Sequence, residues 1–209
     1  MTAEIKQNSL KANKNEALSL LFDTTRALDE CGVIYHLEGG TLLGLVRDGD
    51  LLPWDHDLDI SILSKDRYIA ERALKKLFYK GYRVKSKYFL AGKYALEESG
   101  HRIIKIKKYK SHVFRGILSL FKRKPLTPIT LDVFVKYSDS ENTYWQASSK
   151  VMSVPRCHYE SHDNVSFMGV ELKTPNKVEE YLTLKYGDWK VPVKEWKCSS
   201  DEGTIIGEI

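Results

Sequence analysis

The spacing of apolar residues predicts a helix near the start of the chain, over Asn15–Cys31, which Gly32 ends. The positions that share one helical face are Ala17, Leu18, Leu21, Leu28 and Cys31. A second amphipathic segment, Lys65–Lys80, follows Ser64 as an N-cap and ends at Gly81. Two long helices are therefore expected in the first part of the chain.

Short runs with apolar alternation predict strands around these helices. In Asp57–Leu63, charged and apolar residues alternate as they do along a half-buried strand. Further strands are expected at Val33–Leu37, Tyr82–Leu90, His101–Tyr109, Ile129–Tyr137, Asn142–Ala147 and Val165–Leu172. Shorter helices are expected from Thr41, as the N-cap, to Arg47 and over Asn176–Tyr186. Helices at both ends of a mixed sheet predict an α+β (mixed α/β) fold.

No repeat or linker divides the chain, so its 209 residues are expected to form a single domain, 1–209. Two segments stand apart in composition. One is a basic insert at about 110–128, between two predicted strands. The other is a Trp- and Pro-bearing C-terminal extension at about 187–209, which we expect to wrap back over the body.

The net charge of +5 comes from one part of the chain. Residues 99–131 hold nine Lys or Arg and no Asp or Glu, so a diffuse nucleic-acid-binding surface is not expected. Within 107–124, basic groups flank apolar ones. A helix there would be amphipathic, and two alternatives follow: peripheral contact with an anionic membrane, or an apolar cap on the sheet with lysines facing water or a donor phosphate.

The location of the protein is also predicted from composition. Cys31, Cys157 and Cys198 are odd in number and far apart, which matches a reducing compartment rather than a disulfide framework. The first residues are polar and do not resemble a signal peptide, and no stretch approaches the roughly 20 apolar residues of a membrane span. We expect a cytoplasmic protein, with or without peripheral attachment at the inner face of the membrane.

The candidate chemistry lies in the Asp57–Leu63 strand. Asp57 and Asp59 point to the same face, because side chains alternate along a strand. Two carboxylates so close repel each other, and a divalent cation such as Mg²⁺ or Mn²⁺ holds both ionised. Asp132, between apolar neighbours in a later strand, supplies a third carboxylate. These three residues are predicted as the catalytic metal ligands on a phosphate substrate.

A phosphate-binding segment is expected just upstream. Gly39 and Gly40 allow the backbone to approach a phosphate closely, and the helix that starts at Thr41 offers free amides to the anion. Arg47 adds positive charge.

Three neighbouring residues keep two interpretations each. Asp55 is either a further carboxylate of the site or a turn residue after Pro-Trp. His56 faces away from Asp57 if the strand has begun, which favours a packed or exposed histidine over a catalytic one. Glu38, beside the glycines, is either a general base for the acceptor hydroxyl or, as slightly favoured, a solvated strand end.

These motifs lead to a family resemblance. The segment GGTLLGLVRDGDLLPWDHDLDI, residues 39–60, resembles the signature of the LicD family, which includes phosphocholine transferases and fukutin-related ribitol-phosphate transferases. LDVF, residues 131–134, resembles the family's third-carboxylate strand, and Tyr181-Leu182 with Tyr186-Gly187-Asp188-Trp189 and Pro192 is similar to its closing motif.

The resemblance implies a nucleotidyltransferase-like fold with Asp57, Asp59 and Asp132 as metal ligands and Gly39, Gly40 and Thr41 as the donor-phosphate loop. It also implies transfer of a phospho-alcohol or sugar-phosphate unit from a nucleotide-activated, CDP-linked donor to a hydroxyl of a cell-surface glycan. That glycan would belong to a capsule, lipopolysaccharide or teichoic-type polymer and could be lipid-linked. The alternative is a nucleotidyltransferase that moves a nucleoside monophosphate to a small molecule or glycan. An inactive binding module is disfavoured by the three intact carboxylates.

Overall fold

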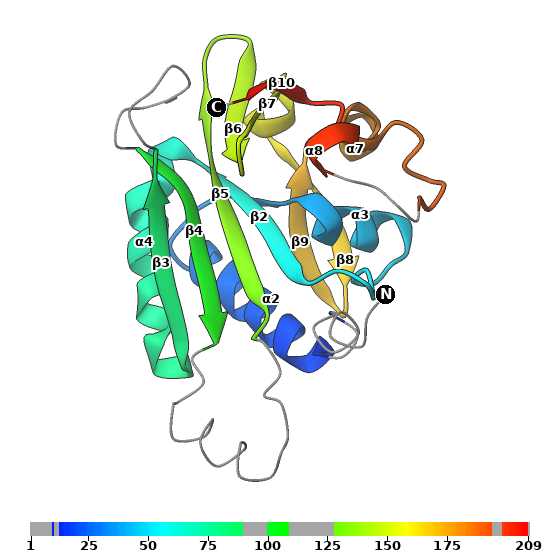
Figure 1. Cartoon of the computed structure of the whole chain (residues 1–209). Helices are drawn as coiled ribbons and strands as arrows, with labels where there is room; N and C mark the ends of the chain where they lie inside the picture. Colours follow the sequence, from blue (N-terminus) through cyan, green and yellow to red (C-terminus); the bar gives the residue numbers. More distant parts are fainter. Residues whose placement is uncertain (1–9, 11–12, 90–99, 109–127, 194–197, 209) are drawn as a thin grey trace.

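A mixed sheet forms the centre of the protein in the computed structural model, which describes residues 10, 13–89, 100–108, 128–193 and 198–208 (Figure 1). Its strands, in spatial order, are β1 (Tyr35–Leu37), β2 (Asp57–Leu63), β5 (Thr130–Ser138), β4 (His101–Lys108) and β3 (Tyr82–Tyr88). Strands β2 and β5 are parallel, and the other pairs of this sheet are antiparallel.

Two helices, α2 (Lys14–Asp29) and α4 (Arg67–Lys75), cover one face of this sheet. The alternate residues of β2 and β5 that build the core are Leu58, Ile60, Ile62, Leu131, Val133 and Val135. Because successive side chains of a strand point to opposite faces, Asp57, Asp59 and Asp132 lie on the other face. Helix α3 (Gly39–Arg47) contacts β2 and brings its N-terminus to that same face.

The end of β5 continues into a second set of strands: β6 (Asn142–Ala147), β7 (Lys150–Pro155) and β10 (Ile205–Glu208), all antiparallel. A separate hairpin, β8 (His162–Phe167) and β9 (Val170–Pro175), lies against β1. The remaining helices are α6 (Cys157–Glu160), α7 (Val178–Tyr186) and α8 (Cys198–Asp201).

The predicted α+β fold with helices around a mixed sheet is confirmed, and β2 and β6 have the predicted bounds. The prediction of a single strand over Val165–Leu172 is wrong. Met168 and Gly169 both adopt positive φ, 51° and 77°, and reverse the chain between β8 and β9. Strands β7 and β10 were not predicted.

The predicted helices differ at their ends. The Lys65–Lys80 helix is a 3₁₀ turn (Ser64–Asp66), α4, and a second 3₁₀ turn (Lys76–Lys80), closed at Gly81 with φ 81°. Helix α3 begins at Gly39 and not after Thr41, because the chain leaves its extended conformation at Glu38.

The C-terminal extension returns to the body, since β10 pairs with β7. The basic insert lies almost entirely outside the described residues. Within the described part of the chain, no helix is both long and apolar enough to cross a bilayer.

Candidate metal and donor site

Three carboxylates meet at the centre of the open sheet face. Asp59 and Asp132 are direct neighbours in the parallel pairing of β2 with β5, and Asp57 lies two residues before Asp59. One oxygen from each of the three lies within 4.8 Å of the others. The fold therefore brings together the carboxylates that were expected to share a site, although Asp132 lies far from the other two in sequence.

Crowding and burial make Asp59 and Asp132 hard to ionise. Burial raises the pKa of Asp59 well above its usual value, and the negative charges of Asp57 and Asp55 add to the effect. Burial also raises the pKa of Asp132, although Lys105 acts in the opposite direction. A bound cation would relieve this repulsion.

The site has the donor atoms that a divalent cation requires. Oδ1 of Asp132 is buried and has no hydrogen-bond partner among the described residues, whereas Oδ2 pairs with Lys105. Mg²⁺, Mn²⁺ and Ca²⁺ prefer hard oxygen ligands, and Oδ1 of Asp132 is a buried carboxylate oxygen without a hydrogen-bond partner in the described part of the chain, in a cluster with two further carboxylates. Asp57, Asp59 and Asp132 can thus hold a divalent metal.

The first two glycines of α3, Gly39 and Gly40, allow carboxylates to lie against the helix N-terminus. A Cβ at Gly39, where φ is 54°, would lie 2.3 Å from Oδ2 of Asp59. A Cβ at Gly40 would lie 2.0 Å from Oδ2 of Asp55. Any larger residue would therefore displace a carboxylate, a role for these glycines that the sequence did not reveal.

Thr41 joins α3 to β2 through a hydrogen bond. Its buried hydroxyl accepts a hydrogen bond of 3.0 Å from the backbone N–H of Asp59. Thr41 does not line the cavity beside the site, so its observed contact is with β2.

A cavity of about 340 Å³ opens beside the carboxylates. Asp59, Gly39, Gly40 and Arg47 contribute to its wall, as does the ammonium-bearing side chain of Lys185. The cavity is also lined by aromatic side chains: Trp54, Phe134, Trp145, Tyr186 and Trp189. It combines positive charge, flat apolar surfaces and a carboxylate cluster at one side.

The other expected residues are placed as follows. Arg47 forms an ion pair with Asp48, with Nε 2.8 Å from Oδ1. Asp55 accepts a hydrogen bond of 2.9 Å from the N–H of His56, as a turn residue does, and also lines the cavity. Burial raises the pKa of Asp55 to about 6. His56 is exposed, so the favoured interpretation of this residue agrees with its position.

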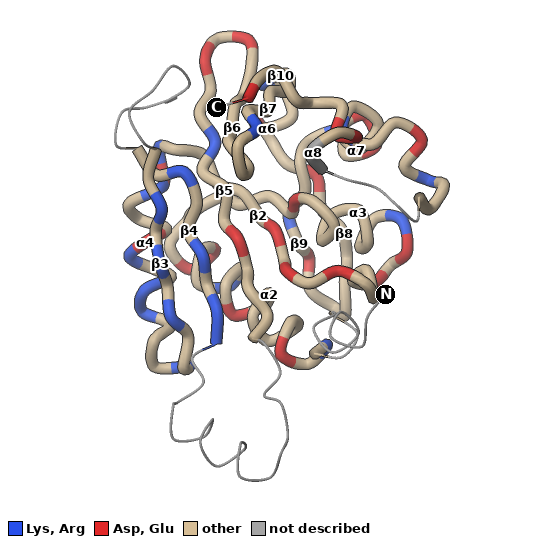
Figure 2. The backbone as a smooth tube through the Cα atoms, viewed as in Figure 1, with Lys and Arg blue, Asp and Glu red and all other residues tan. Residues whose placement is uncertain are grey.

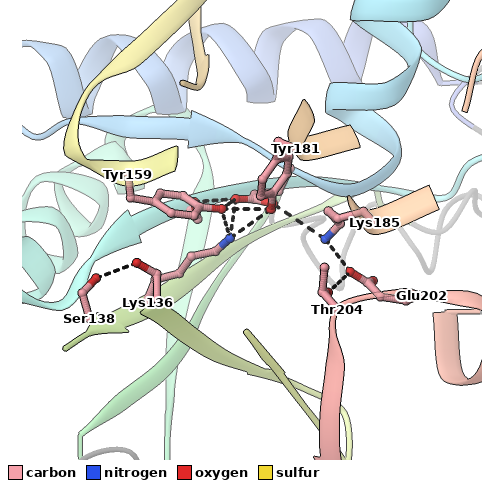
Figure 3. A network of polar contacts seen from close by, with 10 residues as sticks. Lys136, Ser138, Tyr159, Tyr181, Lys185, Glu202 and Thr204 are labelled. Atoms are coloured by element: carbon pink, nitrogen blue, oxygen red, sulfur yellow. Dashed lines mark hydrogen bonds and ion pairs between the residues drawn. The ribbon is translucent and has the colours of Figure 1, made fainter. Parts of the chain in front are cut away.

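A second charged cluster, the Glu38 network, includes Lys136, which lies four residues after Asp132 on β5 and so on the same face. Figure 3 shows its members Lys136, Tyr159, Tyr181, Lys185 and Glu202. Glu38 is 2 % exposed and accepts hydrogen bonds from Lys136 at 2.6 Å, Tyr159 at 2.6 Å and Tyr181 at 2.7 Å. Lys185 extends the network, with its Nζ 2.9 Å from Glu202 and 4.0 Å from Glu38. The solvated alternative for Glu38 is therefore wrong.

The charges of the Glu38 network compensate one another. Burial alone would raise the pKa of Glu38, but Lys136 and Lys185 lower it to about 2. Burial lowers the pKa of Lys136 to about 8, which leaves the ammonium protonated at neutral pH, 3.7 Å from the centre of the Trp145 ring. A carboxylate so acidic and so fully bonded is a poor proton acceptor, which disfavours Glu38 as the general base.

Several residues of the site were not identified from the sequence. Lys105 and Lys136 interrupt apolar strands, and a lysine in such a strand is a signal for a polar role. Lys136 in particular lies four residues after Asp132 and so shares its face. Lys185 and Glu202 meet only through the return of the C-terminal extension, and no motif in that extension indicates this pairing.

Comparison with known proteins identifies the domain. Residues 32–177 match the family described as LicD/FKTN/FKRP, nucleotidyltransferase domain. The chain belongs to this family. The LicD resemblance predicted from the motifs is confirmed, and so is the assignment to a family of transferases. The LicD match contains the three carboxylates and both glycines and ends before Lys185 and Glu202.

Individual relatives are consistent with LicD membership. The chain is 24% identical over 190 residues to the human ribitol-5-phosphate transferase FKTN, covering 88% of this chain and 35% of FKTN. It is 54% identical over 39 residues to human ribitol 5-phosphate transferase FKRP, covering 19% of this chain and 8% of FKRP. The chain thus spans about a third or less of the length of these relatives. A crystal structure of ANT(2")-Ia with adenylyl-2"-tobramycin aligns with a TM-score of 0.44 and 15% identity, covering 87% of this chain and 81% of that one.

Proposed function

We propose that this chain is a metal-dependent transferase that moves a phospho-alcohol or sugar-phosphate unit from a CDP-linked donor to a hydroxyl of a cell-surface glycan. The observation that carries the proposal is the cluster of Asp57, Asp59 and Asp132, with oxygens within 4.8 Å, at the side of a cavity large enough for part of a nucleotide. Membership of the LicD family supports it.

The proposed reaction forms one phosphodiester bond and breaks one phosphoanhydride bond. The acceptor hydroxyl oxygen attacks the phosphorus next to the transferred alcohol, and the bond from that phosphorus to the bridging oxygen breaks. The products are the glycan phosphodiester, CMP and the proton released from the hydroxyl. A Mg²⁺ or Mn²⁺ ion held by Asp57, Asp59 and Asp132 supplies Lewis-acid polarisation of phosphate oxygens.

The side chains of the cavity suit the donor. Burial would lower the pKa of Lys185, but Glu202, Tyr186 and Glu38 raise it, so this residue keeps its positive charge beside Asp59. It is therefore able to bind a donor phosphate, as is Arg47. The aromatic walls offer flat surfaces for a nucleobase. Gly39 and Gly40 lie at the same wall, which is consistent with a donor-phosphate loop.

The biological setting is part of the proposal. The product would be a capsule, lipopolysaccharide or teichoic-type polymer, made in the cytoplasm or at the inner face of the membrane on a lipid-linked acceptor. Contact with the membrane through 107–124 would fit that setting. Of these residues, only Lys107 and Lys108 fall within the described part of the chain.

Donor hydrolysis provides a direct test, because water can replace the acceptor. The chain is incubated with Mn²⁺ and a panel of CDP-, UDP- and GDP-linked alcohols and sugars, including CDP-ribitol and CDP-choline. We expect metal-dependent release of CMP from a CDP-linked donor. Release of pyrophosphate from CTP or ATP, with no CMP from any linked donor, would favour nucleotidyl transfer instead.

A further inference from the structure

The row of side chains that contains the metal-binding carboxylates continues across the sheet as a row of lysines. Asp59 is paired with Asp132 on β5, Asp132 with Lys105 on β4, and Lys105 with Lys85 on β3. Directly cross-strand side chains lie on the same face, about 5 Å apart from strand to strand. The carboxylates and the two lysines thus form one line across the open face.

The neighbouring rows carry further positive charge. Lys107 on β4 is paired with Thr130 on β5 and with Arg83 on β3. Lys87 on β3 is paired with Ile103 on β4. We call the group Arg83, Lys85, Lys87, Lys105 and Lys107 the basic face.

Contacts of the alternate residues show which way the basic face points. The hydroxyl of Ser86 on β3 donates to Glu71 of α4 at 2.5 Å, and Ile104 and Ile106, which alternate with Lys105 and Lys107 on β4, belong to the buried core. Residues of that parity therefore face the helices, and the basic face points away from them. Lys85, Lys87 and Lys107 are exposed. Figure 2 shows the positive charges of β3 and β4 directly beside the negative charges of β5 and β2.

The carboxylates separate this basic face from the cavity. The cavity is bounded by α3, β6 and the C-terminal extension, and none of the described residues of β3 or β4 lines it. A transferase needs two substrates at the metal, and the two sides of the carboxylates offer two different surfaces. One is an aromatic cavity, and the other is an open, positively charged sheet.

We propose that the basic face binds the acceptor, and that the acceptor is a glycan that carries phosphate groups. The assignment rests on the proposed function, in which the cavity holds the donor. Lysine ammonium groups in a row complement a chain of phosphates, and Lys105 links that row to the metal site through its ion pair with Asp132. The acceptor hydroxyl then reaches the donor from the side opposite the cavity.

The composition of the face favours a glycan over other anions. On this side of β3 and β4, every exposed residue is Lys or Arg. Single-stranded nucleic acids are bound by proteins that also present aromatic side chains for base stacking, and amphipathic elements that bind membranes add exposed apolar side chains to their basic ones. Tyr88, the exposed aromatic residue of β3, packs against His101 on the helix side instead.

The experiment compares the binding of fluorescent phosphorylated dextran and neutral dextran of equal length, measured by anisotropy without donor. We expect the protein to bind the phosphorylated form at least about tenfold more tightly, with a steep dependence on salt. A Lys85→Gln/Lys87→Gln/Lys107→Gln variant should lose about tenfold or more of that affinity, and the slope of log affinity against log salt should fall by about two to three.

The matched control removes the same charge from the helix side. Lys65, Arg72 and Lys76 are exposed on the segment 64–80, and Lys65→Gln/Arg72→Gln/Lys76→Gln should keep the affinity for phosphorylated dextran within about twofold. Equal losses in the two triple variants would overturn the proposal, because charge alone and not the basic face would then matter.

Three other results would also overturn it: equal binding of both dextrans, tighter binding of an oligothymidylate of the same charge, or release of the protein from phosphatidylglycerol vesicles by Lys85→Gln/Lys87→Gln, which leaves the segment 107–124 unchanged. The readout requires no turnover. Failure of CMP release with intact phosphodextran binding would count against the proposed function, whereas CMP release without selective binding would count against the acceptor assignment alone.

Discussion

The carboxylate cluster of Asp57, Asp59 and Asp132 and the Glu38 network lie one after the other on the same face of β2 and β5, yet their charges are arranged in opposite ways. Asp57, Asp59 and Asp132 gather like charges, and burial and mutual repulsion raise the pKa of Asp59. Glu38 instead lies among two ammonium groups and two tyrosine hydroxyls, and its pKa falls to about 2.

This difference indicates that the carboxylate cluster requires a cation to balance its charge, whereas the Glu38 network is balanced by itself and stabilises the fold. A cluster of buried like charges destabilises the folded chain unless a cation joins it, so it is retained where binding requires it. A buried cluster with balanced charge has no need of a ligand, but loss of one partner leaves the others uncompensated. The two regions should therefore respond differently to the same kind of substitution.

The largest expected effect is on activity, at the carboxylates. Asp59→Asn, Asp57→Asn or Asp132→Ala should reduce CMP release by about 10³-fold or more, because each removes an ionised ligand of the metal. The melting temperature without metal should stay the same or rise for Asp57→Asn and Asp59→Asn, because each removes repulsion, whereas Asp132→Ala also removes the ion pair with Lys105. Unchanged turnover in any of the three variants would rule out that residue as a ligand.

The next effect is on stability, at the Glu38 network. Glu38→Ala leaves Lys136 buried without the carboxylate that lies 2.6 Å from its Nζ, whereas Lys185 keeps its ion pair with Glu202. The change should cost about 3–5 kcal/mol of unfolding free energy in urea titrations. Glu179→Ala is the control, because Glu179 pairs with Lys190 where both side chains are more than half exposed. That pair should contribute less than about 1 kcal/mol. A similar loss of unfolding free energy in Glu38→Ala and Glu179→Ala would contradict the stabilising role of the Glu38 network.

Metal addition should stabilise the carboxylate region only. At a Mn²⁺ concentration about a hundred times the Kd, the unfolding free energy of the unmodified chain should rise by about 2.7 kcal/mol, seen as a higher melting temperature. Asp132→Ala should abolish the rise, whereas Glu171→Ala, which changes an exposed carboxylate on β9, should preserve it. An equal rise in both variants would place the metal elsewhere.

The smallest expected effect is the pH dependence without metal. Asp55 has a folded pKa of about 6, above its ordinary value of 3.8, so the folded state binds more protons than the unfolded state between those values. Stability should therefore fall as pH rises from about 4 to 6. Asp55→Asn, which keeps an acceptor for the His56 N–H, should flatten this fall by about 1 kcal/mol in urea titrations with EDTA.

The Glu38 network should give the opposite pH response. The pKa of Glu38 in the folded state, about 2, lies below its ordinary value of 4.5. The contribution of Glu38 to the unfolding free energy is therefore fully present above pH 4.5 and is lost as the pH falls towards 2. A stability profile without both slopes would contradict the assigned protonation states.

Local patterns predicted the carboxylate site well. Alternation along a strand placed Asp57 and Asp59 on one face, and the apolar neighbours of Asp132 made it the natural third member. The need for glycine at positions 39 and 40 was harder to predict from the sequence, because the packing of α3 on β2 determines which carboxylates lie against these residues. Sequence identifies glycines, whereas the atoms that require them are defined by tertiary structure.

The Glu38 network could not be predicted for a related reason. Glu38 meets Lys136 and Tyr181 across 98 and 143 residues, and a charged residue next to two glycines ordinarily suggests a solvated turn. The hairpin of β8 and β9 was missed at shorter range, because Met168 adopts a positive φ that β-structure propensities do not favour.

The contacts of Glu38 with residues far along the sequence also affect the order in which the chain folds during synthesis. A ribosome makes Glu38 long before its counter-ions on β5 and α7 exist, and an unpaired carboxylate remains in water. The segment that links β1 to α3 therefore cannot settle into the interior while only the first half of the chain is available. Since the same segment carries Gly39 and Thr41, which hold Asp59 in place, a nascent chain gains the geometry of the carboxylate cluster only after α7 has been translated.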